Sequence, residues 1–119
     1  MTQQQLIIVI VVGLFLVFTI YRRIKLGGNK VKIKEMLKKG AKIIDVRSRG
    51  EFSTGHFAGA INIPLDELQG NVNTLGDKDN PLIVYCASGG RSGSAQRFLQ
   101  AAGFTNVENG VNQGYLQSL

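Results

Sequence analysis

The sequence predicts an α/β domain with a parallel sheet that helices cover on both faces, preceded by one N-terminal transmembrane helix. Three observations support this prediction. From residue 30 onward, short apolar runs of strand length alternate with helical segments. The run 82–85 is apolar at every position, as in a strand buried on both faces. Residues 6–21 form a continuous apolar stretch. We therefore divide the chain into residues 1–29, an apolar helix with a linker, and residues 30–119, the α/β domain.

The apolar stretch predicts a transmembrane helix over about residues 6–24. At the helical rise of 1.5 Å per residue, residues 6–21 span ~24 Å, and flanking residues extend the helix toward the ~30 Å hydrocarbon core. A signal peptide has positive charge before its apolar segment and small residues after it, whereas here Arg22 and Arg23 follow the stretch. A buried core helix has a polar stripe, and this stretch has none. We therefore expect residues 6–24 to lie in the lipid bilayer as an uncleaved anchor.

The distribution of charge predicts the orientation of this anchor. Residues 1–42 carry nine Lys or Arg against Glu35 alone, a net +8, whereas residues 43–119 carry a net −2. The basic residues follow the apolar stretch, and positive flanks stay on the cytoplasmic side. We therefore expect a single-pass protein of the cell membrane with its C-terminal domain in the cytoplasm, where a lone thiol stays reduced. No aromatic residues alternate with the basic ones, so no nucleic-acid partner is expected.

The remaining elements follow from apolar periodicity and from Gly or Pro at segment ends. A flexible joint is expected at residues 26–29. The expected strands are 41–46, 60–63, 82–85 and 104–108. The expected helices are 30–39, 49–53, 65–69 closed by Gly70, 93–102 and 109–119. Asp45 and Arg47 then lie at the C-terminal end of a strand, the edge at which open α/β sheets gather their polar groups.

The only cysteine, Cys86, lies on a short turn between a predicted strand and a predicted helix. Such a turn directs unpaired backbone N–H groups toward one point, and the helix dipole adds positive charge there. Gly89 and Gly90 allow close approach of the backbone, and Arg91 adds a fixed charge. This setting lowers the pKa of a thiol below the ~8.5 of free cysteine. A cysteine that only packs in the core gives no reason for these neighbours, so we interpret Cys86 as a nucleophile.

Two segments of the chain resemble the rhodanese-like sulfurtransferases. The active loop of that family runs Cys-x-x-Gly-x-Arg-Ser/Thr after a central strand, and Cys86, Gly89, Arg91 and Ser92 match it. Upstream, residues 43–64 carry the similar sequence Ile-Ile-Asp-Val-Arg-Ser, then Glu-Phe, then Gly-His-Phe-Ala-Gly-Ala-Ile-Asn-Ile-Pro. The resemblance covers roughly residues 31–115 and leaves the apolar N-terminal segment outside it.

The resemblance implies a sulfurtransferase that carries sulfur on Cys86 as a persulfide. The donor would be a small anion such as thiosulfate, and the acceptor a thiol or cyanide. The substrate-binding residues would be those of the loop: Ala87, Ser88, Gly89, Gly90, Arg91 and Ser92. The resemblance further implies that Asp45 and Arg47 support the fold. Neither a metal nor an organic cofactor is expected, and one cysteine with one histidine excludes a Cys/His metal cluster.

Two other functions stay open at this point. A cysteine-dependent phosphatase has the longer loop Cys-x5-Arg, whereas four residues separate Cys86 from Arg91 here. The other is a non-catalytic binding module at the membrane. Ala87 and Ser88 place no cation beside Cys86, where relatives that use thiosulfate efficiently often have one. Inactive relatives, however, typically lose the cysteine that this chain retains. Residues 109–115 also depart from the usual Gly-Gly and Trp of the family. His56 is not expected to act as a general base, because a thiolate needs none.

Overall fold

The computed structural model describes residues 1–22 and 29–119. It contains four α-helices, α1 (Gln3–Lys38), α2 (Arg49–Ser53), α3 (Gly90–Ala101) and α4 (Gln113–Gln117). Two 3-10 helices, η1 (Leu65–Glu67) and η2 (Gln69–Thr74), lie between the strands. The strands are β1 (Lys42–Asp45), β2 (Ile61–Asn62), β3 (Leu82–Cys86) and β4 (Val107–Asn112). The chain forms two compact units, Met1–Lys32 and Ile33–Leu119.

The first unit is the N-terminal part of α1. Residues Gln3–Arg22 form a helical segment of 20 residues that is long and apolar enough to cross a membrane, and none of it is buried. Its large apolar side chains are exposed all round the helix, which is typical of a helix that contacts lipid and not a protein core. The joint expected at residues 26–29 falls mostly outside the described residues. The helix expected over 30–39 is the last part of α1, which ends at Lys38.

The second unit is built on a four-stranded sheet of order β2-β1-β3-β4, and every neighbouring pair is parallel. β3 lies between β1 and β4, and all five of its residues are buried. Lys42 of β1 pairs with Leu82 of β3, and Leu82 pairs in turn with Val107 of β4. The parallel sheet predicted from the sequence is confirmed.

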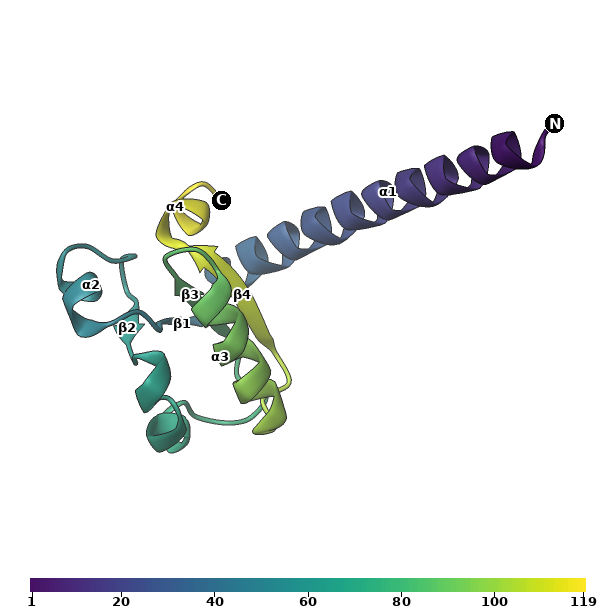
Figure 1. Ribbon diagram of the computed structural model, residues 1–119. Coiled ribbons are helices and arrows are strands. Elements are labelled where there is room, and N and C mark those ends of the chain that lie inside the picture. The colour runs from purple at the N-terminus through teal and green to yellow at the C-terminus, as the bar shows by residue number, and fades with distance from the viewer. The chain divides into compact units, whose positions relative to one another are not determined.

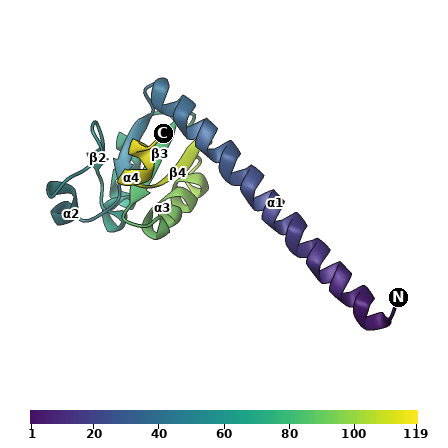
Figure 2. The ribbon, with the colours of Figure 1, turned by 90° about the horizontal axis from the view of Figure 1, so that it is seen from above.

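Helices cover both faces of this sheet, as Figures 1 and 2 show for α3 on one face. Val84 and Cys86 of β3 point into a cluster completed by η1, η2 and α3, with Leu68 and Leu99 among its members. Tyr85 points to the other face, into a cluster that includes residues of α4 and of the C-terminal end of α1. The alternation of side chains along β3 therefore fills two cores, which explains its continuous apolar sequence.

The C-terminal elements differ from the prediction. We expected a strand over 104–108 and a helix over 109–119, but β4 runs from Val107 to Asn112 and α4 begins at Gln113. Phe104 is buried at 2% exposure but precedes the paired part of the strand. The polar sequence Asn109–Asn112 becomes a strand because its backbone pairs with β3, so tertiary pairing overrides a low strand propensity.

The segment after β2 also differs. We expected one helix over 65–69 closed by Gly70, but η1 ends at Glu67 and η2 includes Gly70. Both are 3-10 helices, which suit short connections. β1 and β2 are each shorter at both ends than the expected strands 41–46 and 60–63.

Candidate active site

Cys86 is the last residue of β3, and α3 begins four residues later at Gly90. Gly89 occupies the N-cap of α3 with a φ of 100°, a left-handed conformation that favours glycine. The chain thus turns sharply between a buried strand and a helix, in the order expected from the sequence. Two bounds differ from the prediction: Cys86 ends the strand and does not lie on the turn, and the helix begins at Gly90 and not at residue 93. The turn brings the backbone N–H groups at the start of α3 toward the cysteine side chain.

The Sγ atom of Cys86 is the acceptor at the centre of this turn. The backbone N–H of Gly89 donates to it at 3.0 Å, and that of Ser92 at 3.4 Å. The hydroxyl oxygen of Ser92 lies 3.3 Å from the same sulfur. Although the residue is only 1% exposed and borders the apolar cluster, the sulfur faces these donors. The arrangement suits an anionic sulfur, because amide donors stabilise negative charge.

These contacts explain the acidity of the thiol. Burial by itself raises the pKa of Cys86, because it penalises the charged form. Hydrogen bonds from the Ser92 side chain and from the backbone at Ser92, Ser88 and Gly89 oppose that effect and outweigh it, so that the pKa falls to about 7. A large fraction of Cys86 is therefore thiolate near neutral pH, the form that acts as a nucleophile.

Arg91, expected in the substrate-binding loop, is paired with a residue of α2. Its Nη1 and Nη2 atoms donate to Oε1 and Oε2 of Glu51 at 2.7 and 3.0 Å. The hydrogen bonds from Arg91, followed by those from Ser48, lower the pKa of Glu51 to about 2. Ser48 and Glu51 also form the capping box that begins α2. The sequence analysis missed this partner, and the only signal for it was the Glu-Phe pair upstream.

Asp45 and Arg47 form a second, more buried ion pair. Asp45 is fully buried and accepts from both the Nε and the Nη2 of Arg47, the latter at 2.7 Å. Arg47 Nη2 also donates to the carbonyl of Gly55 at 2.7 Å, and the guanidinium lies 5.6 Å from the ring centroid of Tyr85. The Tyr85 hydroxyl accepts from the N–H of Phe57. These contacts fasten the loop after α2 to the C-terminal edge of the sheet. The supporting role expected for Asp45 and Arg47 stays a prediction.

Asn109 is a further residue of the site that the sequence analysis did not identify. Its Oδ1 accepts the Ser92 hydroxyl at 2.7 Å and the Val111 N–H at 2.9 Å. Its Nδ2 donates to the carbonyl of Gly89 at 3.2 Å. Asn109 thus links β4 to both ends of the turn that surrounds Cys86. No local pattern could have revealed it, since the contact spans 17 residues in sequence.

His56 takes no part in these contacts. Its ring stacks on Phe52 with centroids 3.7 Å apart, and Nδ1 lies 3.0 Å from the carbonyl of Phe52. Within residues 1–22 and 29–119, no hydrogen bond joins His56 to Cys86, and no group of three or more His, Cys, Asp or Glu could hold a metal ion.

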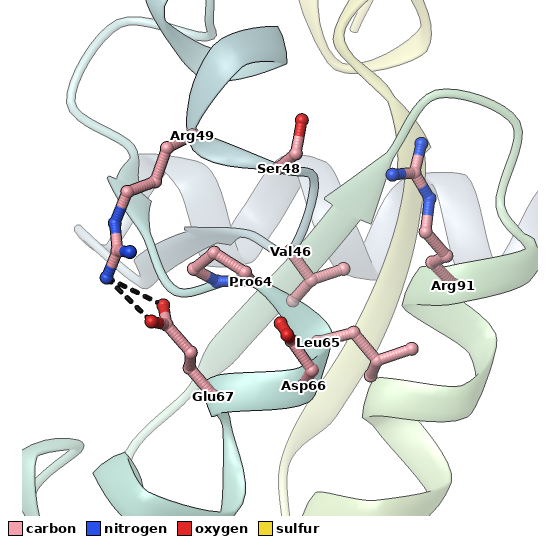
Figure 3. Close-up of a pocket in the computed structure, with 8 residues that line it drawn as sticks. All are labelled: Val46, Ser48, Arg49, Pro64, Leu65, Asp66, Glu67 and Arg91. Atoms are coloured by element: carbon pink, nitrogen blue, oxygen red, sulfur yellow. Dashed lines mark hydrogen bonds and ion pairs between the residues drawn. The ribbon is translucent and has the colours of Figure 1, made fainter.

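An open pocket of about 600 Å³ adjoins the loop through Arg91 (Figure 3). The pocket is lined by Val46, Ser48, Arg49, Pro64, Leu65, Asp66, Glu67 and Arg91. Arg49 and Glu67 form an ion pair at 2.8 Å on the opposite side of the pocket from Arg91. The pocket therefore combines apolar and charged side chains, and Arg91 is the residue of the active loop that lines it.

Comparison with known proteins gives a consistent result. The family model described as "Rhodanese-like domain" matches residues 30–115. The chain is 43% identical over 67 residues to thiosulfate sulfurtransferase PspE of Escherichia coli (strain K12), over 56% of this chain and 64% of the relative. It is 41% identical over 93 residues to thiosulfate sulfurtransferase 16, chloroplastic, of Arabidopsis thaliana, over 68% of this chain and 76% of the relative. The match thus spans just under two thirds of the bacterial relative.

Two solved structures share the fold. A rhodanese with anions from E. coli superposes with a TM-score of 0.61 at 36% identity, over 64% of this chain and 91% of that chain. The human single-domain sulfurtransferase TSTD1 superposes with a TM-score of 0.64 at 26% identity, over 72% of this chain and 90% of that chain.

Proposed function

This chain belongs to the rhodanese-like domain family, and on that basis we propose that it is a membrane-anchored sulfurtransferase that uses Cys86 as its nucleophile. The observation that carries the proposal is the pair of backbone N–H groups, from Gly89 and Ser92, that donate to Sγ of the only cysteine. A neutral thiol is only a weak hydrogen-bond acceptor, whereas a thiolate is stabilised by such donors.

The proposed reaction has two steps. In the first, the thiolate of Cys86 attacks the outer sulfur of thiosulfate or a similar small anion. A sulfur–sulfur bond forms on Cys86 as the bond to the sulfite group breaks, and sulfite leaves with its electron pair. In the second step, an acceptor thiolate or cyanide attacks the outer sulfur of the persulfide. The acceptor leaves as a persulfide or thiocyanate, and the Cys86 thiolate is restored, so no oxidant or cofactor is consumed.

The loop from Ala87 to Ser92 would bind the transferred sulfur. In the persulfide, the negative charge resides on the outer sulfur, and backbone N–H groups at the start of α3 would stabilise it. Arg91 would contribute positive potential, although its charge is largely balanced by Glu51. Its main role would then be to hold the loop in place. The four residues between Cys86 and Arg91 favour sulfur over the larger phosphoryl group.

Mass measurement tests this function. The full chain in detergent micelles is incubated with thiosulfate, and its intact mass is compared before and after. We expect a gain of one sulfur atom that a thiol acceptor removes and that Cys86→Ser abolishes. An unchanged mass would contradict the proposal and favour a non-catalytic binding module. Cys86-dependent release of phosphate from a phenyl phosphate ester would instead indicate a phosphatase.

We also propose that residues 1–29 hold the domain formed by residues 30–119 at the cytoplasmic side of the cell membrane. The exposed apolar surface of Gln3–Arg22 supports the anchor, and the Lys and Arg residues that follow it support the orientation. A cysteine introduced at the exposed Gln117 in a Cys86→Ser background tests it. An impermeant thiol reagent should label that cysteine only after lysis, and labelling of intact cells would reverse the orientation.

A further inference from the structure

The hydroxyl of Ser92 has two acceptors within reach but only one hydrogen to donate. Its oxygen lies 2.7 Å from Oδ1 of Asn109 and 3.3 Å from Sγ of Cys86. Ser92 is fully buried and Cys86 is 1% exposed, so these two neighbours are the hydroxyl's partners in the structure. Which of them receives the hydrogen depends on what each can offer.

The orientation of the Asn109 amide is fixed by the backbone. Oδ1 faces the N–H of Val111 at 2.9 Å, and Nδ2 faces the carbonyl oxygen of Gly89 at 3.2 Å. A flipped amide would place two donors together and two acceptors together. Oδ1 is therefore the atom next to Ser92, and it can only accept. When Cys86 is a neutral thiol, the Ser92 hydrogen points to Asn109 and the S–H donates to the Ser92 oxygen.

Ionisation of Cys86 reverses this preference. The thiolate has no hydrogen to donate and becomes a strong acceptor, so the Ser92 hydroxyl stabilises it only by turning its hydrogen away from Asn109. We propose that Asn109 is a positioning residue that moderates the reactivity of Cys86 by competing with its sulfur for the Ser92 hydrogen. This inference rests on the proposed function only in taking Cys86 as the nucleophile.

Two ion pairs belong to elements that adjoin the loop or β3. From α3, Arg91 interacts electrostatically with Cys86 and is paired with Glu51 of α2. From the end of β1, Asp45 is paired with Arg47. The side chain of Asn109 hydrogen-bonds to Ser92, Gly89 and Val111, which belong to neither pair. A substitution at Asn109 that acts electrostatically must therefore act through the Ser92 hydroxyl or through the loop backbone.

The pKa of Cys86 distinguishes these two routes. It is measured from thiolate absorbance against pH in the full chain in detergent micelles, where the single cysteine gives an unambiguous signal. We expect Asn109→Ala to lower the pKa by about half a unit, an approximately threefold larger acid dissociation constant, since one neutral hydrogen bond no longer competes. We expect Ser92→Ala to raise the pKa, because the thiolate loses a donor.

The double variant provides the decisive comparison. In the Ser92→Ala background, Asn109→Ala should leave the Cys86 pKa unchanged, because there is no hydroxyl left to compete for. A rise in the pKa of the single Asn109→Ala variant would overturn the proposal, since it would mean that Asn109 acts by holding Gly89 in place. An equal shift with and without the Ser92 hydroxyl would also overturn it. The thiol pKa is measurable whether or not sulfur is transferred, so this test is independent of the mass experiment.

A second measurement covers the case in which Asn109→Ala does not fold. In the otherwise unmodified chain, the carbon-13 resonance of the Asn109 side-chain amide should shift as Cys86 ionises, because Oδ1 loses one of its two donors. In Ser92→Ala that shift should be much smaller. A resonance that stays constant through the ionisation, or that moves equally in both proteins, would contradict the proposal.

Discussion

Arg91 and Glu51 lie 40 residues apart in the chain and are joined by two hydrogen bonds of 2.7 and 3.0 Å. The pair connects the first turn of α3, which directly follows Cys86 and its turn, to α2, which lies between β1 and β2 in the chain. The cation that the sequence suggested for substrate binding is therefore also a tether. Loss of the Glu51 charge should therefore loosen the start of α3.

Replacing Glu51 with Gln should impair sulfur transfer. The amide cannot balance the guanidinium, so the loop loses a charge-assisted tether, and we expect kcat/KM for thiosulfate to fall roughly tenfold. Steady-state assays of the full chain measure it. Glu35→Gln is the matched control, because it makes the same chemical change in an exposed ion pair of α1 and should leave the rate unaltered. Equal losses in both variants would disprove the tether.

The rate of persulfide formation should follow the ionisation of Cys86. Because the folded-state pKa is lowered to about 7, the rate should rise as the pH increases through that value and then level off. Single-turnover mixing with thiosulfate over a pH series measures this profile, and alkylation with iodoacetamide gives an independent estimate of the same pKa. A rate that rises only near the ~8.5 typical of free cysteine would contradict the hydrogen-bond arrangement at Sγ.

Two adjacent glycines of the loop should respond differently to substitution. Gly89 has a φ of 100°, and a Cβ placed there would lie 3.3 Å from Cγ1 of Val111, whereas a Cβ at Gly90 meets nothing within 4 Å. Gly89→Ala should therefore displace the N–H that donates to the sulfur and reduce kcat/KM by roughly tenfold or more. Gly90→Ala should remain close to the unmodified protein. Similar activities for the two variants would show that the left-handed turn is dispensable.

Replacing Asp45 with Asn should mainly lower the free energy of unfolding of the domain and not the reactivity of Cys86. Asp45 is fully buried and the Arg47 side chain is only 12% exposed, so the substitution leaves a nearly buried guanidinium without its counter-charge. The loss should be roughly 3–5 kcal/mol in the free energy of unfolding. Urea denaturation measures it, with Glu67→Gln at a more exposed pair as the control, for which ~0–1 kcal/mol is expected. A small loss for Asp45→Asn would contradict the supporting role.

Membrane anchoring by the N-terminal helix can be tested independently of the active site. Introducing Arg at both Val11 and Leu14 should oppose membrane insertion, since each costs about 2.5–3.5 kcal/mol near the centre of a span. Alkaline extraction of membranes should then release the double variant while the unmodified chain stays with the lipid. Ala at the same two positions is the control and should remain membrane-bound. Release of the unmodified chain would show that this helix is not an anchor.

The predictive power of the sequence was greatest where local pattern and tertiary environment agree. The run 82–85 is apolar because β3 fills two cores, and the glycines beside Cys86 reflect the turn that they form. The strand, the turn and the helix could therefore all be predicted. α2 was predicted with its correct bounds, and the structure shows that Ser48 and Glu51 begin it with a capping box, which is a local sequence pattern.

The features that the sequence did not predict are set by contacts between distant residues. Asn109 has a low strand propensity and was assigned to a helix, yet β3 draws it into β4 and so places its side chain beside Ser92. Likewise, Glu51 becomes the partner of Arg91 only when the crossover brings α2 beside the start of α3. Such pairings depend on topology, and periodicity in one segment contains no information about them.

The order of strands in the sheet also determines when the sheet can be completed during synthesis. β1 is translated early but pairs with β3 through Lys42 and Leu82, and β3 pairs with β4 through Leu82 and Val107. The central strand therefore has only one of its neighbours until the ribosome has released residues near 112. During that interval, the apolar segment of α1 is already outside the exit tunnel and therefore accessible before the sheet is complete.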